Sequence, residues 1–373
     1  MRGRKRVRHG ISHISALVSA PLVLAAAPAA AFDDAALARQ AYERHILPGY
    51  ARFAAAAQDF ATRTDDLCKA PSADALAKAR DAARSAVIAW GRMENIRFGP
   101  ITTKQRLDRL LFYPDPHGIA RRQIDRLLAS HDSSDVTPEK LAGASVAVQG
   151  FTAVDHVLYG KGSETLAVPA PAVPFRCLYL QTLAAGIAQI AEDTHREWAG
   201  GDYKSTWLSP GGANKAYLSA KETTQALFRS YVTELEVIRL QRLVPLLGRD
   251  EKTSGRAESL LPRSGLALPF ILANIEGERT LLTESGFIDP ALADGDKEQS
   301  AMAILGSIVT DLGFAIRAGE AAATMAPNPF ADAKARDRLA PMLLSMKNAE
   351  ETGRAALGDL TGQSLGFNSL DGD

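Results

Sequence analysis

The sequence predicts an all-α protein made of two helical bundles. Alanine is abundant, and apolar residues recur at helical spacing along almost the whole chain. Between residues 175 and 198, for example, Cys177, Leu180, Ala184, Ile187 and Ala191 form one stripe of a helix. No alternating strand pattern and no Asn-Gly hairpin signal is present. These observations favour amphipathic helices that bury one face each.

Ten helices are expected, in chain order. In the first half they cover residues 34–66, 73–96, 102–112, 117–130 and 138–160, and Pro48 should kink or split the first of them. In the second half they cover residues 174–199, 211–247, 264–285, 296–325 and 331–359. Glycine and proline mark most of the ends, as in Gly99-Pro100 and Gly200-Gly201.

Long helices joined by short polar turns pack as antiparallel bundles, and ten helices make two bundles rather than one. A mature chain of this length also exceeds the size at which a single hydrophobic core stops growing. We therefore expect one bundle over residues 32–200 and a second over residues 201–373. GFTAVDHVLYG in the first half and SGLALPFILANIEG in the second share a glycine followed by an apolar run, which suggests duplication.

Residues 1–31 read as a secretory signal peptide, with a basic start, an apolar run and small residues before Phe32. No cysteine stands at the cleavage point to accept a lipid, and no apolar run of the roughly 18 residues needed for a membrane span follows. The sequence thus predicts a periplasmic protein without a transmembrane segment. After removal of the signal, 43 acidic residues outnumber 38 basic ones, which makes nucleic acid an unsuitable partner.

The chain has two cysteines, Cys68 and Cys177, and an oxidising compartment allows such a pair to persist as a disulfide. The bond would connect the end of the first helix to a helix 109 residues later, and by loop entropy it would contribute roughly 4 to 5 kcal/mol. Two buried free thiols are the alternative. No CxxC motif is present, so the role would be structural.

Three polar residues lie within GFTAVDHVLYG, residues 150–160, on an otherwise apolar helix. Thr152 precedes Asp155 by three residues and His156 by four, so the three side chains share nearly one face. They could form a metal or ligand site. Alternatively, Thr152 bonds back to the carbonyl of Val148, Asp155 pairs with an arginine of another helix, and His156 is a hydrogen-bonded core histidine.

A second candidate lies in AWGRMENIRFGP, residues 89–100. Trp90, Glu94 and Arg97 follow one another at spacings of four and three, which places them on one side of a helix. They form either a surface ion pair or a partly buried group that positions a ligand. Glu192 and His195 form a single ExxH, which fits a solvated face better than a di-iron site.

Common enzyme signatures are absent: the sequence has no HExxH, Walker loop or GxSxG, and no cysteine placed as a nucleophile. Five histidines remain after signal removal, at positions 45, 117, 131, 156 and 195, and no two have the spacing of helical metal ligands. A zinc hydrolase would have to assemble its ligands from distant helices.

The chain resembles the imelysin family, also called insulin-cleaving-protease-like proteins, and in particular its periplasmic branch, whose members are often lipoproteins. The motifs that carry the resemblance are AWGRMENIRFGP with FYPDP, VQGFTAVDHVLYG, RCLYLQTLAAGIAQIAEDTHREW, RLQRLVPLLG, SGLALPFILANIEG and LGFNSLDGD. The resemblance implies two duplicated helical bundles and a link to iron acquisition. The GxHxxE motif of the family falls on Gly150, Thr152 and Asp155, so threonine and aspartate replace its histidine and glutamate.

The expected function is therefore a non-enzymatic periplasmic binding or accessory protein in iron handling. Asp155, Glu94 and His156 would hold a metal ion such as iron, zinc or calcium, and Thr152, Arg97 and Trp90 would line the pocket. One alternative is a metallopeptidase in which Asp155 holds the metal and Glu94 is the general base. Another is a scaffold for an outer-membrane or iron-uptake component.

Overall fold

The structure, a computed structural model, describes residues 3, 32–115, 117–248, 260–293 and 295–364, and over these residues it is helical with no strand. The predicted all-α class is confirmed. The expected signal peptide at residues 1–31 and the C-terminal LGFNSLDGD motif lie outside the described residues.

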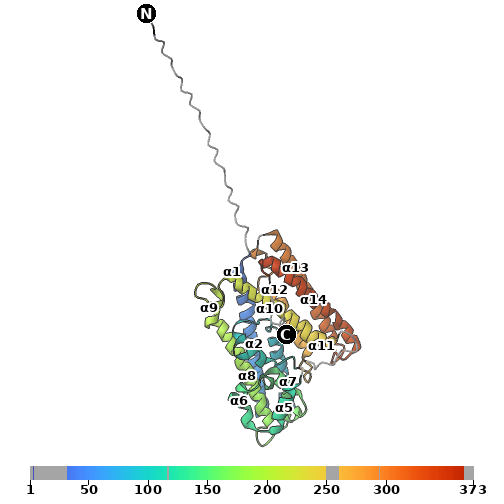
Figure 1. Ribbon diagram of the computed structural model, residues 1–373. Helices are drawn as coiled ribbons and strands as arrows, with labels where there is room; N and C mark the ends of the chain where they lie inside the picture. Colours follow the sequence, from blue (N-terminus) through green and yellow to red (C-terminus); the bar gives the residue numbers. More distant parts are fainter. Residues whose placement is uncertain (1–2, 4–31, 116, 249–259, 294, 365–373) are drawn as a thin grey trace.

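The helices of the first half surround the long helices α2 and α8 (Figure 1). Their bounds are α1 Asp34–Gln40, the π-helix η1 Ala41–Ile46, α2 Leu47–Lys69, α3 Ala73–Gly91, η2 Gly99–Gln105, α4 Arg106–Leu110, α5 Ile119–Ser130, η3 Ser133–Val136, α6 Pro138–Gly143, η4 Val146–Val148, α7 Gly150–Tyr159, η5 Ser163–Ala167 and α8 Phe175–Ala199.

In the second half, α13 and α14 lie side by side at one edge of the molecule, and α12 and α10 pack against them (Figure 1). The elements of this half are α9 Asp202–Leu208, α10 Ala220–Glu236, the π-helix η6 Val237–Leu243, α11 Val244–Leu247, α12 Ala267–Glu284, η7 Pro290–Leu292, α13 Asp296–Ala323 and α14 Ala333–Thr361. The expected helices at residues 174–199, 264–285, 296–325 and 331–359 thus match α8, α12, α13 and α14 within three residues at each end.

The expected continuous helix over residues 138–160 is wrong, because the chain breaks into α6, η4 and α7. The break before α7 occurs at Gly150, whose φ is +61°. A Cβ atom at this position would lie 2.3 Å from the carbonyl oxygens of both Arg109 and Leu110. Only glycine allows this left-handed backbone and this close approach, so Gly150 fixes α7 against the end of α4. Similarly, the expected helix 211–247 begins only at Ala220.

The predicted disruption at Pro48 takes the form of a π-helix. Proline has no N–H to donate to the carbonyl four residues earlier, as an α-helix requires. In the turn before Pro48 the hydrogen bonds instead span five residues, as in the bond from the Leu47 N–H to the Tyr42 carbonyl. The same arrangement recurs before Pro245, where the Val244 N–H bonds to the Arg239 carbonyl. This shared feature is consistent with duplication, which itself stays a prediction.

The two halves share one buried hydrophobic cluster. Helix α12 of the second half contacts α3 of the first half as well as α13. Likewise, α10 of the second half contacts α1 of the first half as well as α14, so the core is continuous across the two halves. The expected boundary between residues 200 and 201 stays a prediction. Because the core is continuous, the polar groups at this junction are withdrawn from water.

Helix α13 is, among the described residues, the helix that is long and apolar enough to cross a membrane, with a mean hydropathy of 1.5 over 18 residues. It pairs along α14 and contributes Met302, Leu305 and Leu312 to the core. A core helix passes the same test of length and composition, so the expectation that the mature chain has no membrane span stays a prediction.

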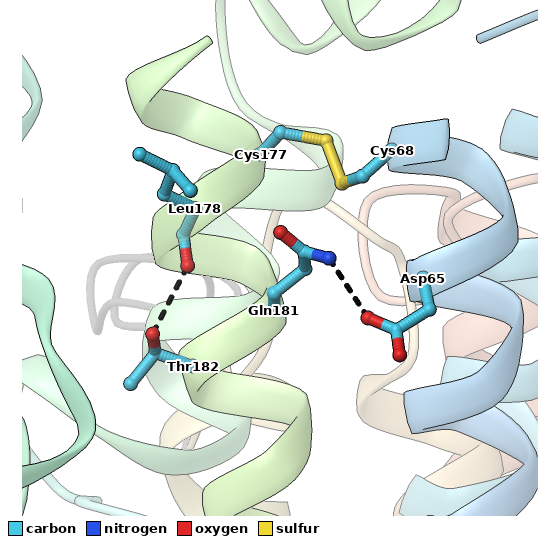
Figure 2. Close-up of a disulfide and its surroundings, with 6 residues drawn as sticks. All are labelled: Asp65, Cys68, Cys177, Leu178, Gln181 and Thr182. Atoms are coloured by element: carbon cyan, nitrogen blue, oxygen red, sulfur yellow. Dashed lines mark hydrogen bonds between the residues drawn. A yellow bond between two sulfur atoms is a disulfide. The ribbon is translucent and has the colours of Figure 1, made fainter. Parts of the chain in front are cut away.

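The predicted disulfide between Cys68 and Cys177 is present. It joins the end of α2 to the first turn of α8, with the two Cα atoms 5.8 Å apart (Figure 2). One turn further along α8, the Gln181 side chain donates a hydrogen bond of 2.8 Å to Asp65 of α2. Together these contacts fix the relative position of the two long helices of the first half.

Candidate functional site

The three polar residues of α7 lie beside a small cavity. Thr152, Asp155 and His156 line it together with residues of α5, of the 112–115 segment and of the turn at residues 260–263. The free space measures about 40 Å³. Since one buried water needs roughly 10–15 Å³ by this measure, the cavity has room for about three waters, or for one ion that keeps only part of its water shell.

Asp155 is buried, and its carboxylate caps the 260–264 turn. Its two oxygens accept hydrogen bonds from the backbone N–H groups of Ser264 at 2.8 Å and Arg263 at 3.1 Å. The Arg263 guanidinium lies 3.7 Å away. Burial raises the pKa of Asp155 above its ordinary value, although the bonds from Ser264 and Arg263 oppose that rise. The predicted arginine partner therefore exists, but in a turn and not in another helix.

His156 is held neutral at physiological pH. Burial, followed by the positive charge of Arg263, lowers its pKa to about 4. The charges of Asp115 and Asp125 act in the opposite direction, and that of Arg121 adds to the lowering. A neutral imidazole is the form that binds a metal ion or accepts a proton. The His156 side chain is thus in the uncharged form at neutral pH.

Thr152 donates its hydroxyl to the carbonyl oxygen of Phe112 at 3.1 Å. The expected back-bond to Val148 is not formed, because that carbonyl accepts from the Tyr179 hydroxyl at 2.7 Å. The chain is not continuously helical from Val148 to Thr152, because α7 begins only at Gly150. Val148 and Thr152 therefore do not share a helical turn. Thr152 therefore ties α7 to the 112–115 segment.

The cavity carries balanced charge. Arg121 and Arg263 are its cations, and Asp115 and Asp155 are its anions. Both carboxylates are engaged by backbone N–H groups: Asp115 accepts from Ile119 at 2.7 Å and from Ala120 at 2.8 Å at the start of α5. Among the described residues, the Arg263 guanidinium has the Asp155 carboxylate as its charged neighbour, at 3.7 Å. The cavity can therefore accept an anion alongside a cation.

A second polar group lies in the core between the two halves, centred on Arg242. This guanidinium donates to Glu94 at 2.7 Å, to Glu234 at 3.1 Å and to the Asn274 side chain at 2.6 Å. Asn274 in turn donates to the other oxygen of Glu94 at 3.1 Å, and Arg97 donates to Glu234 at 2.9 Å. We call these five residues the Arg242 cluster.

The Arg242 cluster corrects the expectation for Glu94 and Arg97. Helix α3 ends at Gly91, so these two residues follow it in a turn and do not form a surface pair along a helix. Each finds its partner in the second half of the chain, Glu94 in Arg242 and Arg97 in Glu234. Glu94, Glu234 and Arg242 are buried and Arg97 is partly exposed, and the two ion pairs link the turn after α3 to α10 and η6.

The electrostatics of the Arg242 cluster are dominated by burial. Burial, followed by the nearby Glu94, raises the pKa of Glu234 to about 7, against the opposing charges of Arg242 and Arg97. Glu278, fully buried on α12, has its pKa raised well above 4.5 by burial and then by Glu234. The hydrogen bond with the Asn95 side chain opposes that rise of the Glu278 pKa. Burial disfavours the charge of Arg242, but Glu94 and Glu234 outweigh it and raise its pKa.

Trp90 belongs to the core and does not line the cavity of α7. Its ring is fully buried and lies 5.4 Å from the ring of Phe53, centroid to centroid. Glu192 and His195 lie at the solvent side of α8, while Trp198 of the same segment is buried.

The predicted ligand set of Glu94, Asp155 and His156 is not brought together. Asp155 and His156 share the cavity, but Glu94 does not line it. Over residues 32–115, 117–248, 260–293 and 295–364, no group of three or more His, Cys, Asp or Glu side chains is placed to hold a metal ion. The described residues thus offer two protein donors at α7.

Sequence reasoning did not identify Glu234, Arg242, Asn274 and Glu278. Their signal was available in part, because each is a polar residue on the apolar face of an expected helix, and Asn274 and Glu278 fall within SGLALPFILANIEG. Which of them meet depends on helices far apart in the sequence.

The pKa of His156 gives a testable pH dependence. The imidazole titrates near 6.5 in the unfolded chain and near 4 in the folded protein. Its contribution to stability is therefore fully present above pH 6.5 and is lost as the pH falls to 4. We expect the stability of the wild type, relative to His156→Gln, to fall by up to about 3 kcal/mol between pH 7 and pH 4.

Urea denaturation of both proteins at half-unit pH intervals measures this difference. The carboxylates with raised pKa values are common to both proteins and cancel in the comparison. A pH-independent difference would contradict the neutral, buried state of His156. His131→Gln, at the exposed residue that follows α5, is the control and should follow the wild type.

Comparison with known proteins identifies the family. The family model described as Imelysin matches residues 46–365. An imelysin-like protein from Psychrobacter arcticum 273-4 has a similar structure, with a TM-score of 0.71 at 18% identity over 90% of this chain and 99% of that one. A putative iron-regulated protein A precursor from Parabacteroides distasonis ATCC 8503 gives 0.68 at 15% identity over 88% and 94%. No curated protein matches the chain. The chain belongs to the imelysin family.

Proposed function

We propose that this protein is an exported, non-enzymatic accessory protein of iron handling, and that the cavity of α7 binds the metal ion. The observation that carries the proposal is the cavity itself: its roughly 40 Å³ suit an ion that keeps only part of its water shell, and not a peptide chain. Family membership and the printed name of the Parabacteroides protein support the link to iron.

His156 and Asp155 would hold the ion. A neutral imidazole and a carboxylate are suitable donors for iron, and each Asp155 oxygen keeps a lone pair beyond its bond to a backbone N–H. Two protein ligands leave coordination positions for water or for an anion that arrives with the metal. Arg121 and Arg263, which line the same cavity, would balance the charge of such an anion.

The metallopeptidase alternative receives less support. Thr152, at the family histidine position, offers no imidazole and is bound to Phe112. Glu94, the expected general base, is bound to Arg242 and Asn274. A catalytic zinc centre commonly uses three protein ligands and an open position, and the described residues provide two here. A scaffold role without a ligand is the remaining alternative.

Metal analysis of the purified protein tests the proposal. Protein prepared from the periplasm and offered ferric or ferrous iron should retain about one equivalent, and His156→Gln should reduce the affinity at least tenfold because one of the two protein donors is lost. Thr152→Ser, which keeps the hydroxyl donor, is the matched control on the same helix and should bind as the wild type does.

Two results would contradict the proposal. Absence of bound iron at millimolar supply, with the fold intact by circular dichroism, would favour a scaffold. Peptide hydrolysis that chelator abolishes and that Asp155→Ala removes would establish a peptidase.

A further inference from the structure

A second cleft lies between α4, α6 and α8, and it shares no lining residue with the cavity of α7. Its volume is about 400 Å³. That value falls in the range of clefts that bind small organic molecules. The cleft combines a cationic end with an apolar wall, and the two parts indicate what it would hold.

Arg109 provides the cationic end. Its Nε donates to the Gln149 side chain at 2.9 Å, and Gln149 is itself fixed by a bond to the Ala144 carbonyl at 3.0 Å. Within the described part of the chain, no acceptor lies on either Nη atom of Arg109 and no carboxylate pairs with it. Gln149 thus orients the Arg109 guanidinium through Nε and leaves its two Nη groups available to a ligand. Arg109 is half-buried in the wall of the cleft.

The neighbouring charges do not neutralise Arg109. Arg106 is engaged by Glu197, which it contacts at 2.6 and 3.1 Å. Asp193, the acidic residue lining the cleft, is bound by Arg196. Burial and the charge of Arg106 lower the pKa of Arg109, which is the effect of an uncompensated cation. A ligand with a negative charge would compensate the positive charge of Arg109.

Lys104 adds to the cationic end and stands in a strained backbone. Lys104 and Gln105 have φ values of +53° and +55°, a left-handed pair that residues with a side chain rarely adopt. This turn places Lys104 at the same cleft as Arg109. Strain of this kind concentrates at functional positions.

The opposite part of the cleft is apolar and open. Its wall consists of side chains from α6 and α8, namely Pro138, Leu141, Ala142, Ala185 and Ile190. Gly186 lies in the interior of α8 within this wall, and a Cβ atom there would meet no atom within 4 Å. A glycine weakens the helix interior, and here no close neighbour requires it. Its effect is to leave space in the cleft.

We propose that this cleft binds a small organic carboxylate with an apolar tail, with Arg109 pairing the carboxylate and the α6–α8 wall covering the tail. The planar guanidinium matches a carboxylate with two parallel hydrogen bonds. Inorganic phosphate has no apolar group that could contact the α6–α8 wall, so the wall favours a carboxylate with a tail over phosphate. The inference is independent of iron binding, because the two sites have no residue in common.

Octanoate is the probe, with acetate, octan-1-ol and inorganic phosphate as comparison ligands, and isothermal titration calorimetry measures binding to the mature protein. Octanoate should bind at least tenfold more tightly than any of the other three, since it alone offers both a carboxylate and a tail. Equal binding of phosphate or of octan-1-ol would overturn the proposal, as would no octanoate binding at 10 mM.

Two pairs of variants locate the site. Gly186→Leu should fill the cleft and abolish octanoate binding, whereas Gly306→Leu, an equally unobstructed helix-interior position on α13, should bind as the wild type does. Arg109→Gln should weaken binding at least tenfold with partial recovery in Arg109→Lys, and Arg126→Gln on the exposed face of α5 should have no effect. Unchanged binding in both Gly186→Leu and Arg109→Gln would place octanoate elsewhere and overturn the assignment. Iron content should stay that of the wild type in all five variants.

Discussion

Replacing Arg242 by methionine should lower the free energy of unfolding by about 3 to 5 kcal/mol at pH 8. Arg242 is almost fully buried and carries the hydrogen bonds to Glu94, Glu234 and Asn274. Methionine conserves much of the apolar contact with Phe270, over whose ring the guanidinium lies at 5.0 Å. The loss therefore comes mainly from leaving the carboxylates of Glu94 and Glu234 buried without a cation.

The pH dependence separates this cause from a packing defect. Glu234, left without the Arg242 cation, takes up a proton as the pH falls, since burial already raises its pKa to about 7 in the wild type. The destabilisation of Arg242→Met should therefore be clearly smaller at pH 5 than at pH 8. Arg279→Met, which breaks a half-exposed pair with Glu276, is the control and should cost less than about 1 kcal/mol. A loss below 1 kcal/mol for Arg242→Met would refute the assigned role.

Removing the disulfide with Cys68→Ala and Cys177→Ala should lower the free energy of unfolding by about 4 kcal/mol. The bond closes a loop with a sequence separation of 109 residues, and long loops lose the most entropy in the unfolded chain when they are crosslinked. Urea denaturation of the double variant and of the wild type in the presence and absence of reductant measures the effect.

Reduced wild type and the double variant should unfold at the same urea concentration, because both lack the crosslink. Gln181→Ala, which removes the neighbouring bond to Asp65, is the control and should cost about 1 kcal/mol. Equal stability of the oxidised and the reduced wild type would contradict this prediction, because the disulfide would then not stabilise the fold by lowering the conformational entropy of the unfolded chain.

The sequence was sufficient to predict the elements whose signal is local. The apolar stripe of α8 and the long helices α12, α13 and α14 follow from helical periodicity, since a helix buries one face whatever its partner is. The disulfide was predicted from the count of two cysteines together with the expected signal peptide. Thr152, Asp155 and His156 were recognisable as a group because they are close together along the chain, and their role as a ligand site stays a prediction.

Local signal failed where a distant segment sets the conformation. Gly150 interrupts the expected helix 138–160 because the carbonyls of Arg109 and Leu110 approach it, and these belong to α4. The spacing of Glu94 and Arg97 suggested that they pair with each other, yet the end of α3 at Gly91 turns both toward the second half of the chain.

By itself, then, the sequence determined the helical class, the main long helices and the identity of the polar residues on α7. The tertiary structure alone decided the partners of those residues: which backbone amides Asp155 caps, that Glu94 lies with Arg242 and away from His156, and that Arg109 faces an open cleft. The physical reason is that helix formation and amphipathicity act over a few residues. Pairing of buried charges depends on which helices meet, and that is fixed by packing of the whole core.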